Sequence, residues 1–342
     1  MPVLRSLKLC LLTMTLSLAA CDSTSKLPQY ELNGSALGTT FSVLLVAPGE
    51  EFSAEPLQTR ILETIDRVDN LASTWRDDSE LSLFNASEET EWVTTSIEFC
   101  EAIQQVLEIS ELTDGAFDVT VGPLVNLWGF GPGGEVRQPP AEDDVLATKA
   151  ETGYQNLQAN CDLPAVKKQS RGIYVDLSGW AKGYAVDQVA TMLDRNELKD
   201  YLVEIGGELR VRGHNAEGLN WAVAIELPST TRRVPHSVLR VTDTGVATSG
   251  DYRNFFEHDG RLYSHTIDAR TGWPVSHSLA AVTVVNPSAA YADAMATALL
   301  VLGPTDGPQR AEQLNLAAHF LIRNETNVET VTTTSFERLT TS

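Results

Sequence analysis

Residues 173–187 read IYVDLSGWAKGYAVD, a stretch that passes from strand-like residues through a glycine turn to helical spacing. Ile173 to Leu177 predict a strand, and the residues at about 180–195 predict a helix that begins after Gly179. Backbone N–H groups at the start of a helix favour anions, and Lys182 in the first turn adds a positive charge. The Gly-x4-Gly-Lys-Ser/Thr spacing of a P-loop is absent. The stretch favours contact with a phosphate or a metal; the simpler alternative is a tight strand–helix junction with a solvated lysine.

The residues before this stretch predict one strand, two helices and a long loop. Residues 35–47 are rich in β-branched and apolar residues and predict an opening strand. Apolar residues recur at helical spacing over 55–72 and again from about Ser96 to Thr113, where Asp114-Gly115 ends the second helix. Glycine, proline and charged residues dominate 129–145, which predicts a loop or an insertion.

The residues after it alternate between short strand-like runs and single helices. Strands are predicted at Tyr201 to Ile205, Trp221 to Leu227, Val238 to Val241 and Leu279 to Val285, and a helix at about 289–302. Hairpin-like runs with isolated helices favour an α+β fold with mainly antiparallel sheets, not a doubly wound Rossmann sheet. The Thr-rich C-terminal stretch is either a terminal strand or a frayed end.

Composition narrows the class of protein. The 342 residues are 42% hydrophobic, enough for a large packed core, and neither disorder nor a fibrous repeat fits that composition. The chain carries 25 Lys and Arg against 46 Asp and Glu, a formal net charge of −21. Such acidity argues against nucleic acid as a partner, because the phosphate backbone recruits Lys and Arg. It does not exclude a phosphorylated small molecule held by backbone amides, a few cations or a metal.

Residues 1–20 have the pattern of a signal peptide. Arg5 and Lys8 form a short positive region, and Leu9 to Leu18 form an apolar run that is short for a membrane span. The run ends in Leu-Ala-Ala before Cys21, which matches a bacterial lipoprotein cleavage box. The alternative is an ordinary signal peptide that happens to contain a cysteine.

A lipobox implies lipidation of Cys21 and anchoring to a membrane by two or more acyl chains. Asp22 resembles the signal that retains such lipoproteins on the inner membrane of many Gram-negative bacteria. We therefore expect a lipidated cysteine and tether over 21–28 and a single domain over 29–342. Cys100 and Cys161 then remain, and we interpret both as structural, with their pairing left open.

Three further patches have more polar and glycine character than packing requires. In the first, residues 115–123 (GAFDVTVGP), Asp118 follows a predicted helix, where its carboxylate could accept hydrogen bonds from a heterocycle. The alternative is a helix cap followed by a strand.

The second patch combines residues 247–253 (ATSGDYR) and 264–272 (SHTIDARTG). His265 lies beside a serine and three residues before Asp268, a polar setting in which a histidine could remove a proton from an attacking alcohol. The alternative is a histidine that is simply hydrogen-bonded at the surface or in the core.

The third patch is residues 291–300 (YADAMATALL). Asp293 and Thr297 stand four residues apart on one face of a helix near its start. Carboxylate and hydroxyl oxygens at this spacing suit a hard cation such as Mg²⁺. The alternative is an aspartate that favours the helix dipole and a packed threonine. Signatures of serine hydrolases and of zinc sites are absent from the sequence.

In this order the patches resemble the ApbE family, the FAD:protein FMN transferases. The resemblance runs from Leu37-Gly38-Thr39 to about Leu302, nearly the whole mature chain. Each motif is weak alone, but their shared order is specific. Besides the four patches, the segments that carry it are STW (73–75), SEL (79–81), FN (84–85) and IGGE (205–208).

The resemblance implies an α+β, T-fold-like architecture and a defined reaction. FAD would be the substrate, with Mg²⁺ on its diphosphate, and a Thr or Ser hydroxyl of an acceptor redox protein would attack the FMN-side phosphorus. AMP would leave, and FMN would stay attached to the acceptor through a phosphoester. The family's usual acceptors would place the chain on the periplasmic face of the bacterial inner membrane, which suits a lipid anchor.

The resemblance also implies a set of site residues. Asp293 and Thr297 match side-chain metal ligands, and Gly179 matches a ligand through its backbone carbonyl. His265 is the candidate for proton removal, and Asp251 or Asp268 would orient it or act as the base. The positions that match flavin-nucleotide contacts are Leu37, Trp75, Ala116, Phe117, Asp118, Asp176, Lys182 and Ile267.

Two positions depart from the family pattern, because Leu37 replaces a common Met and Trp75 a common Tyr. Both replacements could still cover an aromatic ring of FAD. Two other functions stay open: an FAD pyrophosphatase that uses water and releases FMN and AMP, and a non-catalytic flavin-binding lipoprotein. The Asp293/Thr297 pair and His265 argue against pure storage, since binding alone needs no site that activates phosphorus.

Overall fold

The computed structural model describes residues 27–341 except residues 48, 50–51, 135–136, 230–233, 253 and 326. The predicted signal peptide, Cys21 and most of the predicted tether lie outside the described residues. None of the described helices has the length and apolar character needed to span a bilayer.

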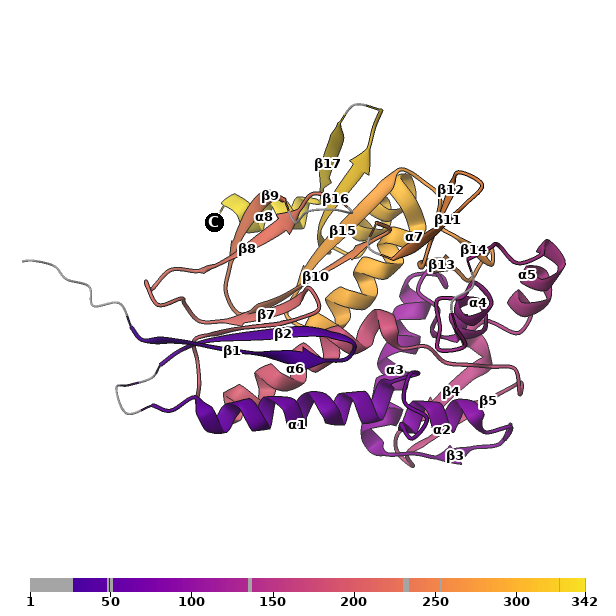
Figure 1. Cartoon of the computed structure of the whole chain (residues 1–342), viewed down its shortest axis with the longest axis horizontal. Coiled ribbons are helices and arrows are strands. Elements are labelled where there is room, and N and C mark those ends of the chain that lie inside the picture. The colour runs from indigo at the N-terminus through magenta and orange to yellow at the C-terminus, as the bar shows by residue number, and fades with distance from the viewer. Residues whose placement is uncertain are drawn as a thin grey trace, which may run out of the picture.

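An antiparallel sheet of eight strands forms the centre of the molecule, in the order β1-β2-β6-β7-β10-β15-β16-β17 (Figure 1). Successive side chains of a strand point to opposite faces of the sheet. Phe41 and Val43 therefore pack against the helices, and Leu44 packs on the opposite face. The strands are β1 (Gln29–Ala36), β2 (Thr39–Val46), β6 (Tyr201–Ile205), β7 (Glu208–Arg212), β10 (Thr244–Gly250), β15 (Leu279–Asn286), β16 (Ala317–Arg323) and β17 (Val328–Thr332).

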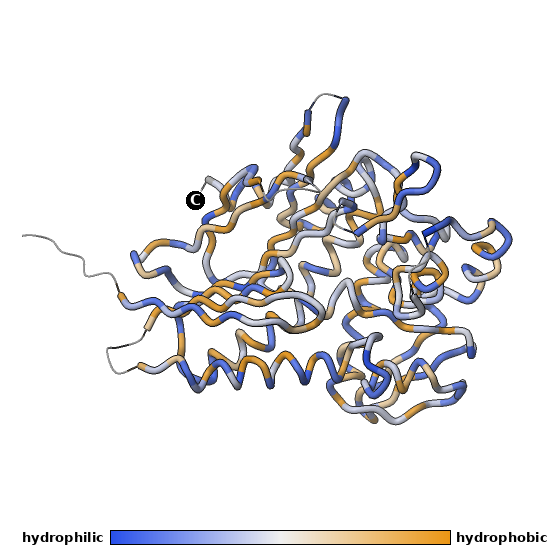
Figure 2. The backbone as a smooth tube through the Cα atoms, viewed as in Figure 1, coloured by the Kyte–Doolittle hydropathy of each residue, from blue (hydrophilic) through white to orange (hydrophobic). Residues whose placement is uncertain are grey.

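Helices cover one face of this sheet and a β-ribbon covers the other. The helical layer contains α1 (Glu55–Ala72), α6 (Ser178–Arg195) and α7 (Ala289–Gln313). Figure 2 shows hydrophobic residues recurring turn by turn along α1, as expected for a helix with one buried face. On the opposite face, Trp221 and Phe336 are buried among residues of the sheet. That layer consists of β8 (Trp221–Glu226), β9 (Pro235–Val241) and α8 (Thr334–Thr341).

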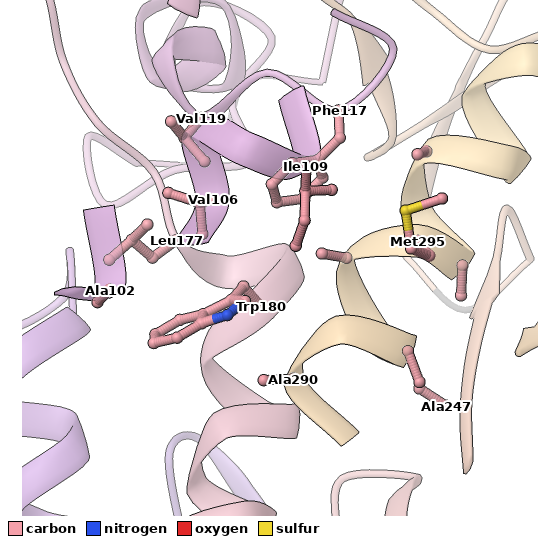
Figure 3. Packing of buried hydrophobic residues seen from close by; sticks show 14 of the residues in the cluster. Ala102, Val106, Ile109, Phe117, Val119, Leu177, Trp180, Ala247, Ala290 and Met295 are labelled. Carbon is pink, nitrogen blue, oxygen red and sulfur yellow. The ribbon is translucent and has the colours of Figure 1, made fainter. Parts of the chain in front are cut away.

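A second group of elements packs against α6 and α7. Val106 and Ile109 lie close to Trp180 of α6 and Met295 of α7 in one continuous apolar cluster (Figure 3). A disulfide joins Cys100 to Cys161, which answers the question of pairing that the sequence left open. The group contains α2 (Glu80–Ala86), β3 (Val93–Thr94), α3 (Ile97–Leu112), β4 (Leu157–Asn160) and β5 (Ala165–Lys168).

A third group of short elements surrounds an aromatic cluster. Trp128 is fully buried there and donates its indole N–H to the Gly272 carbonyl at 2.9 Å. The elements are η1 (Val119–Val121), α4 (Gly122–Leu127), α5 (Glu142–Lys149), η2 (Tyr154–Asn156), β11 (Phe255–His258), β12 (Arg261–Ser264), β13 (Ile267–Asp268) and β14 (Trp273–Pro274).

Helices α6 and α7 cross unusually closely, and this crossing positions the site. A Cβ on Gly183 would lie 2.3 Å from the Ala289 carbonyl oxygen, so only glycine fits. Asp187 of α6 caps α7, because its carboxylate accepts hydrogen bonds from the Ser288 hydroxyl and from the backbone N–H groups of Ala289 and Ala290 at 2.8–3.1 Å.

The α+β fold with mainly antiparallel pairing is confirmed, and both upstream helices lie where they were predicted. Two strand predictions were wrong. Residues 35–47 contain a hairpin turn at Leu37 and Gly38, which both have positive φ. Residues 173–177 form no strand, because the Asn85 side chain bonds both the N–H and the C=O of Val175 in place of a neighbouring strand.

Candidate active site

Two adjoining cavities lie where α6 and α7 begin and β10 ends. The inner cavity has a volume of about 330 Å³ and the outer about 600 Å³, and Ser178 and Lys182 line both. Leu37 and Trp75 line the outer cavity. The inner one is lined by the remaining predicted site residues of the described chain: Ala116, Phe117, Asp118, Asp176, Gly179, Lys182, His265, Ile267, Asp293 and Thr297. The fold therefore gathers every one of them except Cys21, which lies outside the described residues.

The predicted metal ligands come from two helices. Asp293 and Thr297 lie one turn apart on α7, and the Asp293 carboxylate accepts a hydrogen bond from the backbone N–H of Gly183 at 3.1 Å. A Cβ on Gly179 would lie 3.3 Å from the Thr297 hydroxyl oxygen, so the backbone of α6 passes close to that hydroxyl. The same hydroxyl is 3.0 Å from that of Ser249.

Lys182 lies between two buried carboxylates. Its Nζ is 2.8 Å from Glu208 Oε1 and 3.8 Å from Asp293 Oδ2. Burial raises the pKa of both carboxyl groups, whereas the lysine charge opposes that rise. Within the described part of the chain, the buried Oε2 of Glu208 has no hydrogen-bond partner. One lysine therefore faces two carboxylates that are almost entirely removed from water.

This arrangement fits a divalent cation. The described residues contain no cluster of three His, Cys, Asp or Glu side chains that could hold a metal. A carboxylate, a hydroxyl and a backbone carbonyl are nonetheless the hard oxygen donors that Mg²⁺ takes, usually together with substrate phosphates. Two carboxyl groups beside one lysine and the orphaned Glu208 oxygen agree with a cation at Asp293, Thr297 and Gly179.

The geometry of His265 suits a base. Its Nδ1 lies 3.0 Å from the carbonyl oxygen of Asn254, and because a carbonyl can only accept, Nδ1 carries the proton. Nε2 is then the basic nitrogen. Burial lowers the pKa of His265, with a smaller contribution from Lys182, so the imidazole is neutral near pH 7.

Among the described residues, neither Asp251 nor Asp268, the predicted orienting groups, is hydrogen-bonded to His265. Asp251 forms a two-point ion pair with Arg323, at 2.6 and 2.7 Å. Asp268 forms another with Arg270, at 2.9 Å for both contacts. Each arginine matches its carboxylate in fork geometry, so both carboxylates already have a strong partner. The Asn254 carbonyl orients His265 instead.

Asp118 and Asp176 both shape the wall of the inner cavity. Asp118 caps η1 by accepting hydrogen bonds from the N–H and the hydroxyl of Thr120, and its second oxygen accepts from the Tyr154 N–H at 3.0 Å. Burial raises the pKa of Asp118. Asp176 accepts from the Ser178 N–H at 2.8 Å at the start of α6.

The outer cavity has an apolar rim. Leu37 stands at the tip of the β1–β2 hairpin with a φ of 52°, and Trp75 lies across the cavity with 69% of its surface exposed. An exposed tryptophan at the mouth of a cavity is an available stacking surface for an aromatic ring.

Sequence reasoning gave no role to Glu208 or to Asn254, although both line the inner cavity. Glu208 follows two glycines directly after a predicted strand. A charged residue in such a glycine turn is a signal from which a role in the site could have been predicted. The contribution of Asn254 is its carbonyl, and no side-chain pattern reveals a backbone group.

Comparisons with known proteins show the family of the chain. Residues 37–320 match the model of the ApbE family. A protein from Haemophilus influenzae named FAD:protein FMN transferase is 38% identical over 96% of this chain and 95% of its own length. A protein of the same name from Escherichia coli is 38% identical over 87% of this chain and 86% of its own length. The structure of the flavin transferase ApbE from Vibrio cholerae superimposes with a TM-score of 0.84, at 37% identity, over 91% of this chain and 99% of that chain.

Proposed function

The chain belongs to the ApbE family, and from that premise we propose that it is an FAD:protein FMN transferase. It transfers the FMN part of FAD to a Thr or Ser hydroxyl of an acceptor protein and releases AMP. One observation carries the proposal: a neutral histidine and a set of hard oxygen donors line the same cavity, beside a lysine on a helix start.

Each residue has a task in this reaction. His265 Nε2 accepts the proton of the acceptor hydroxyl as its oxygen bonds to the FMN-side phosphorus, and the bond from that phosphorus to the AMP oxygen breaks. Lys182 and the N–H groups at the start of α6 bind the diphosphate. Asp293, Thr297 and the Gly179 carbonyl would hold Mg²⁺, which offsets the diphosphate charge and polarises phosphorus when bound.

FAD is long enough to need both cavities. Leu37 and Trp75 at the outer cavity would cover an aromatic ring of FAD, while the diphosphate lies over Ser178 and Lys182, where the two cavities meet. Phe117 and Ile267 supply apolar surface in the inner cavity. Fixing the substrate in this way aligns attacking and leaving oxygens, a substantial part of the barrier in phosphoryl transfer.

We further propose that the mature chain is anchored through lipidated Cys21 on the periplasmic face of the inner membrane. The Cys100–Cys161 disulfide supports an oxidising compartment, because such bonds are rare in the cytosol. Redox proteins with a Thr or Ser acceptor site on that side of the membrane are the acceptors.

One experiment tests the transferase against its alternatives. The chain without residues 1–21 is incubated with FAD, Mg²⁺ and a soluble acceptor domain of a membrane redox pump, and the products are separated on a denaturing gel. Flavin fluorescence on the acceptor supports the transferase. Free FMN and AMP without labelling would identify a pyrophosphatase, and bound, uncleaved FAD would identify a storage protein.

A further inference from the structure

The hairpin formed by β11 and β12 has two unlike faces. Phe256 and Tyr263 are paired across it and stack on each other with ring centroids 5.0 Å apart. Both belong to the buried aromatic cluster, where Tyr263 stacks on Trp128 at 5.5 Å and Phe256 on Phe130 at 5.7 Å. Because side chains alternate along a strand, the neighbouring residues point the other way.

The opposite face of the hairpin carries exposed apolar side chains, with Glu257 paired to Leu262 on the same face. Phe255 is 36% exposed and Leu262 is 57% exposed, and both line a groove of about 630 Å³. Tyr252 and Val275 contribute apolar surface to the same groove, and Ser264 lies at its inner end. An exposed aromatic and an exposed leucine on one strand face mark a binding surface more often than a stable solvent face.

The charged side chains of the groove leave one positive charge. Asp251 and Arg323 line it and form the two-point ion pair already described, so together they contribute no net charge. Arg261 also lines the groove, with its guanidinium over the Tyr263 ring at 5.3 Å. Apolar side chains beside a single arginine are typical of a surface that binds a protein segment, and in a chain with a formal net charge of −21 this charge favours a neutral or acidic segment.

Residues that line the groove are direct chain neighbours of residues in the active site. His265 follows Ser264 directly, and both its backbone N–H and its Nδ1 lie 3.0 Å from the Asn254 carbonyl, which extends the hairpin pairing by one residue. Asp251 in the groove follows Gly250 in the inner cavity. Yet the groove and the two cavities share no lining residue among those described, so a molecule in the groove leaves the FAD cavities free.

We propose that this groove binds the acceptor protein, as an extended segment that lies along the β11–β12 hairpin and brings its hydroxyl to His265. The inference rests on the proposed transferase function. A protein substrate must reach the base from a surface that FAD does not fill, and Ser264 in this groove directly precedes His265 in the chain. A hairpin that forms a separate two-stranded sheet can also accept another strand at its edge.

The test compares two leucines of similar exposure. Leu262→Asp places a charge in the groove, whereas Leu219, 51% exposed before β8, lies outside it and gives the control Leu219→Asp. We expect Leu262→Asp to raise the KM for the acceptor domain by about tenfold or more, the effect of losing one strong interface contact, with kcat and the Kd for FAD unchanged. Phe255→Asp should act in the same direction, and Leu219→Asp should leave the KM within about twofold.

The outcomes separate the two proposals. If the wild-type chain labels the acceptor and both groove variants keep its KM, the groove is not the docking site, although the transferase stands. If the wild-type chain labels no acceptor, the transferase fails and the docking proposal fails with it. Circular-dichroism melting confirms that the variants are folded, and anisotropy of the labelled acceptor domain without FAD measures docking directly.

Discussion

The charge balance around Lys182 is the most consequential feature at the scale of single residues. Two buried, ionised carboxylates against one lysine are unfavourable in a low-dielectric site, and either a proton or a cation relieves them. Under the proposed function, the buried acids would recruit the cation that a diphosphate needs, so an acidic protein could bind one. Without that cation, ionised Glu208 and Asp293 would repel the substrate.

Asp293→Asn tests this metal assignment. The amide keeps the shape of the side chain and removes its charge, so we expect loss of acceptor labelling at all Mg²⁺ concentrations. Mg²⁺ should raise the melting temperature of the wild-type FAD complex but not that of the variant. Asp306→Asn, at an exposed position of α7 beyond the kink at Gly303, is the control. Normal labelling by Asp293→Asn would remove Asp293 from the metal site.

The pH profile tests the base. His265 acts only when neutral, and burial lowers its pKa, so transfer is fully present above the folded-state pKa and falls as pH drops through it. We expect the acid limb of kcat/KM for the acceptor to lie below pH 6.5, the usual value for histidine. His265→Ala should lose about 10²–10⁴-fold in kcat and lose the acid limb as well. An acid limb unchanged in the variant would assign the base to another group.

At the scale of residues, the sequence identified side chains that come to line one site, but it did not identify their hydrogen-bond partners. The polar patches are local in sequence, so their members could be identified, and the fold brings them to one cavity. Which group orients His265 depends on distances between segments. Asp251 and Asp268 looked suitable in sequence, but each lies against an arginine, and Arg323 is 72 residues away from Asp251.

At the scale of elements, Lys168 connects α2 to the segment that carries Asp176. Its ammonium group is fully buried and donates to the carbonyls of Phe84, Asn85 and Ser87 at the end of α2. Asn85 in turn holds the backbone of Val175 by two hydrogen bonds of 2.8 Å. Lys168 therefore bonds the free carbonyls at the end of α2 and, through Asn85, helps to hold the segment that leads to Asp176.

We expect Lys168→Met to lower the free energy of unfolding more than Lys167→Met does. Methionine fills the space but leaves the carbonyls of α2 without a donor, so we expect a loss of about 1–3 kcal/mol in the free energy of unfolding. Lys167→Met, which removes only a partly exposed ion pair with Glu91 at 3.5 Å, should change it by less than about 1 kcal/mol. Urea denaturation measures both, and equal stability of the two variants would contradict this role.

At the scale of elements, the sequence predicted helices and strands from local patterns. It could not show where a distant side chain takes the place of a neighbouring strand. Residues 55–72 were predicted with the right bounds because apolar spacing alone defines the buried face of α1. Residues 173–177 have the composition of a strand, but a side chain 90 residues away takes the place of the neighbouring strand. The turn at Leu37 was missed because leucine rarely adopts positive φ.

At the scale of the whole molecule, the Cys100–Cys161 disulfide closes a loop with a sequence separation of 61 residues, and that loop contains Phe117 and Asp118. Closing such a loop restricts the unfolded chain, so the double variant Cys100→Ser, Cys161→Ser should lose about 2–4 kcal/mol of stability. A reductant should lower the melting temperature of the wild type but not of the double variant. Equal melting temperatures for both chains without reductant would contradict the prediction.

The separation of the groove from the two cavities also bears on the kinetic mechanism. The proposed acceptor groove shares no described lining residue with the cavities, so it leaves room for both substrates on the protein together. We therefore expect the hydroxyl to meet FAD directly, without a flavinylated enzyme in between. Double-reciprocal plots at several fixed concentrations of the second substrate should then intersect, whereas a relay through the protein's own side chains would give parallel lines.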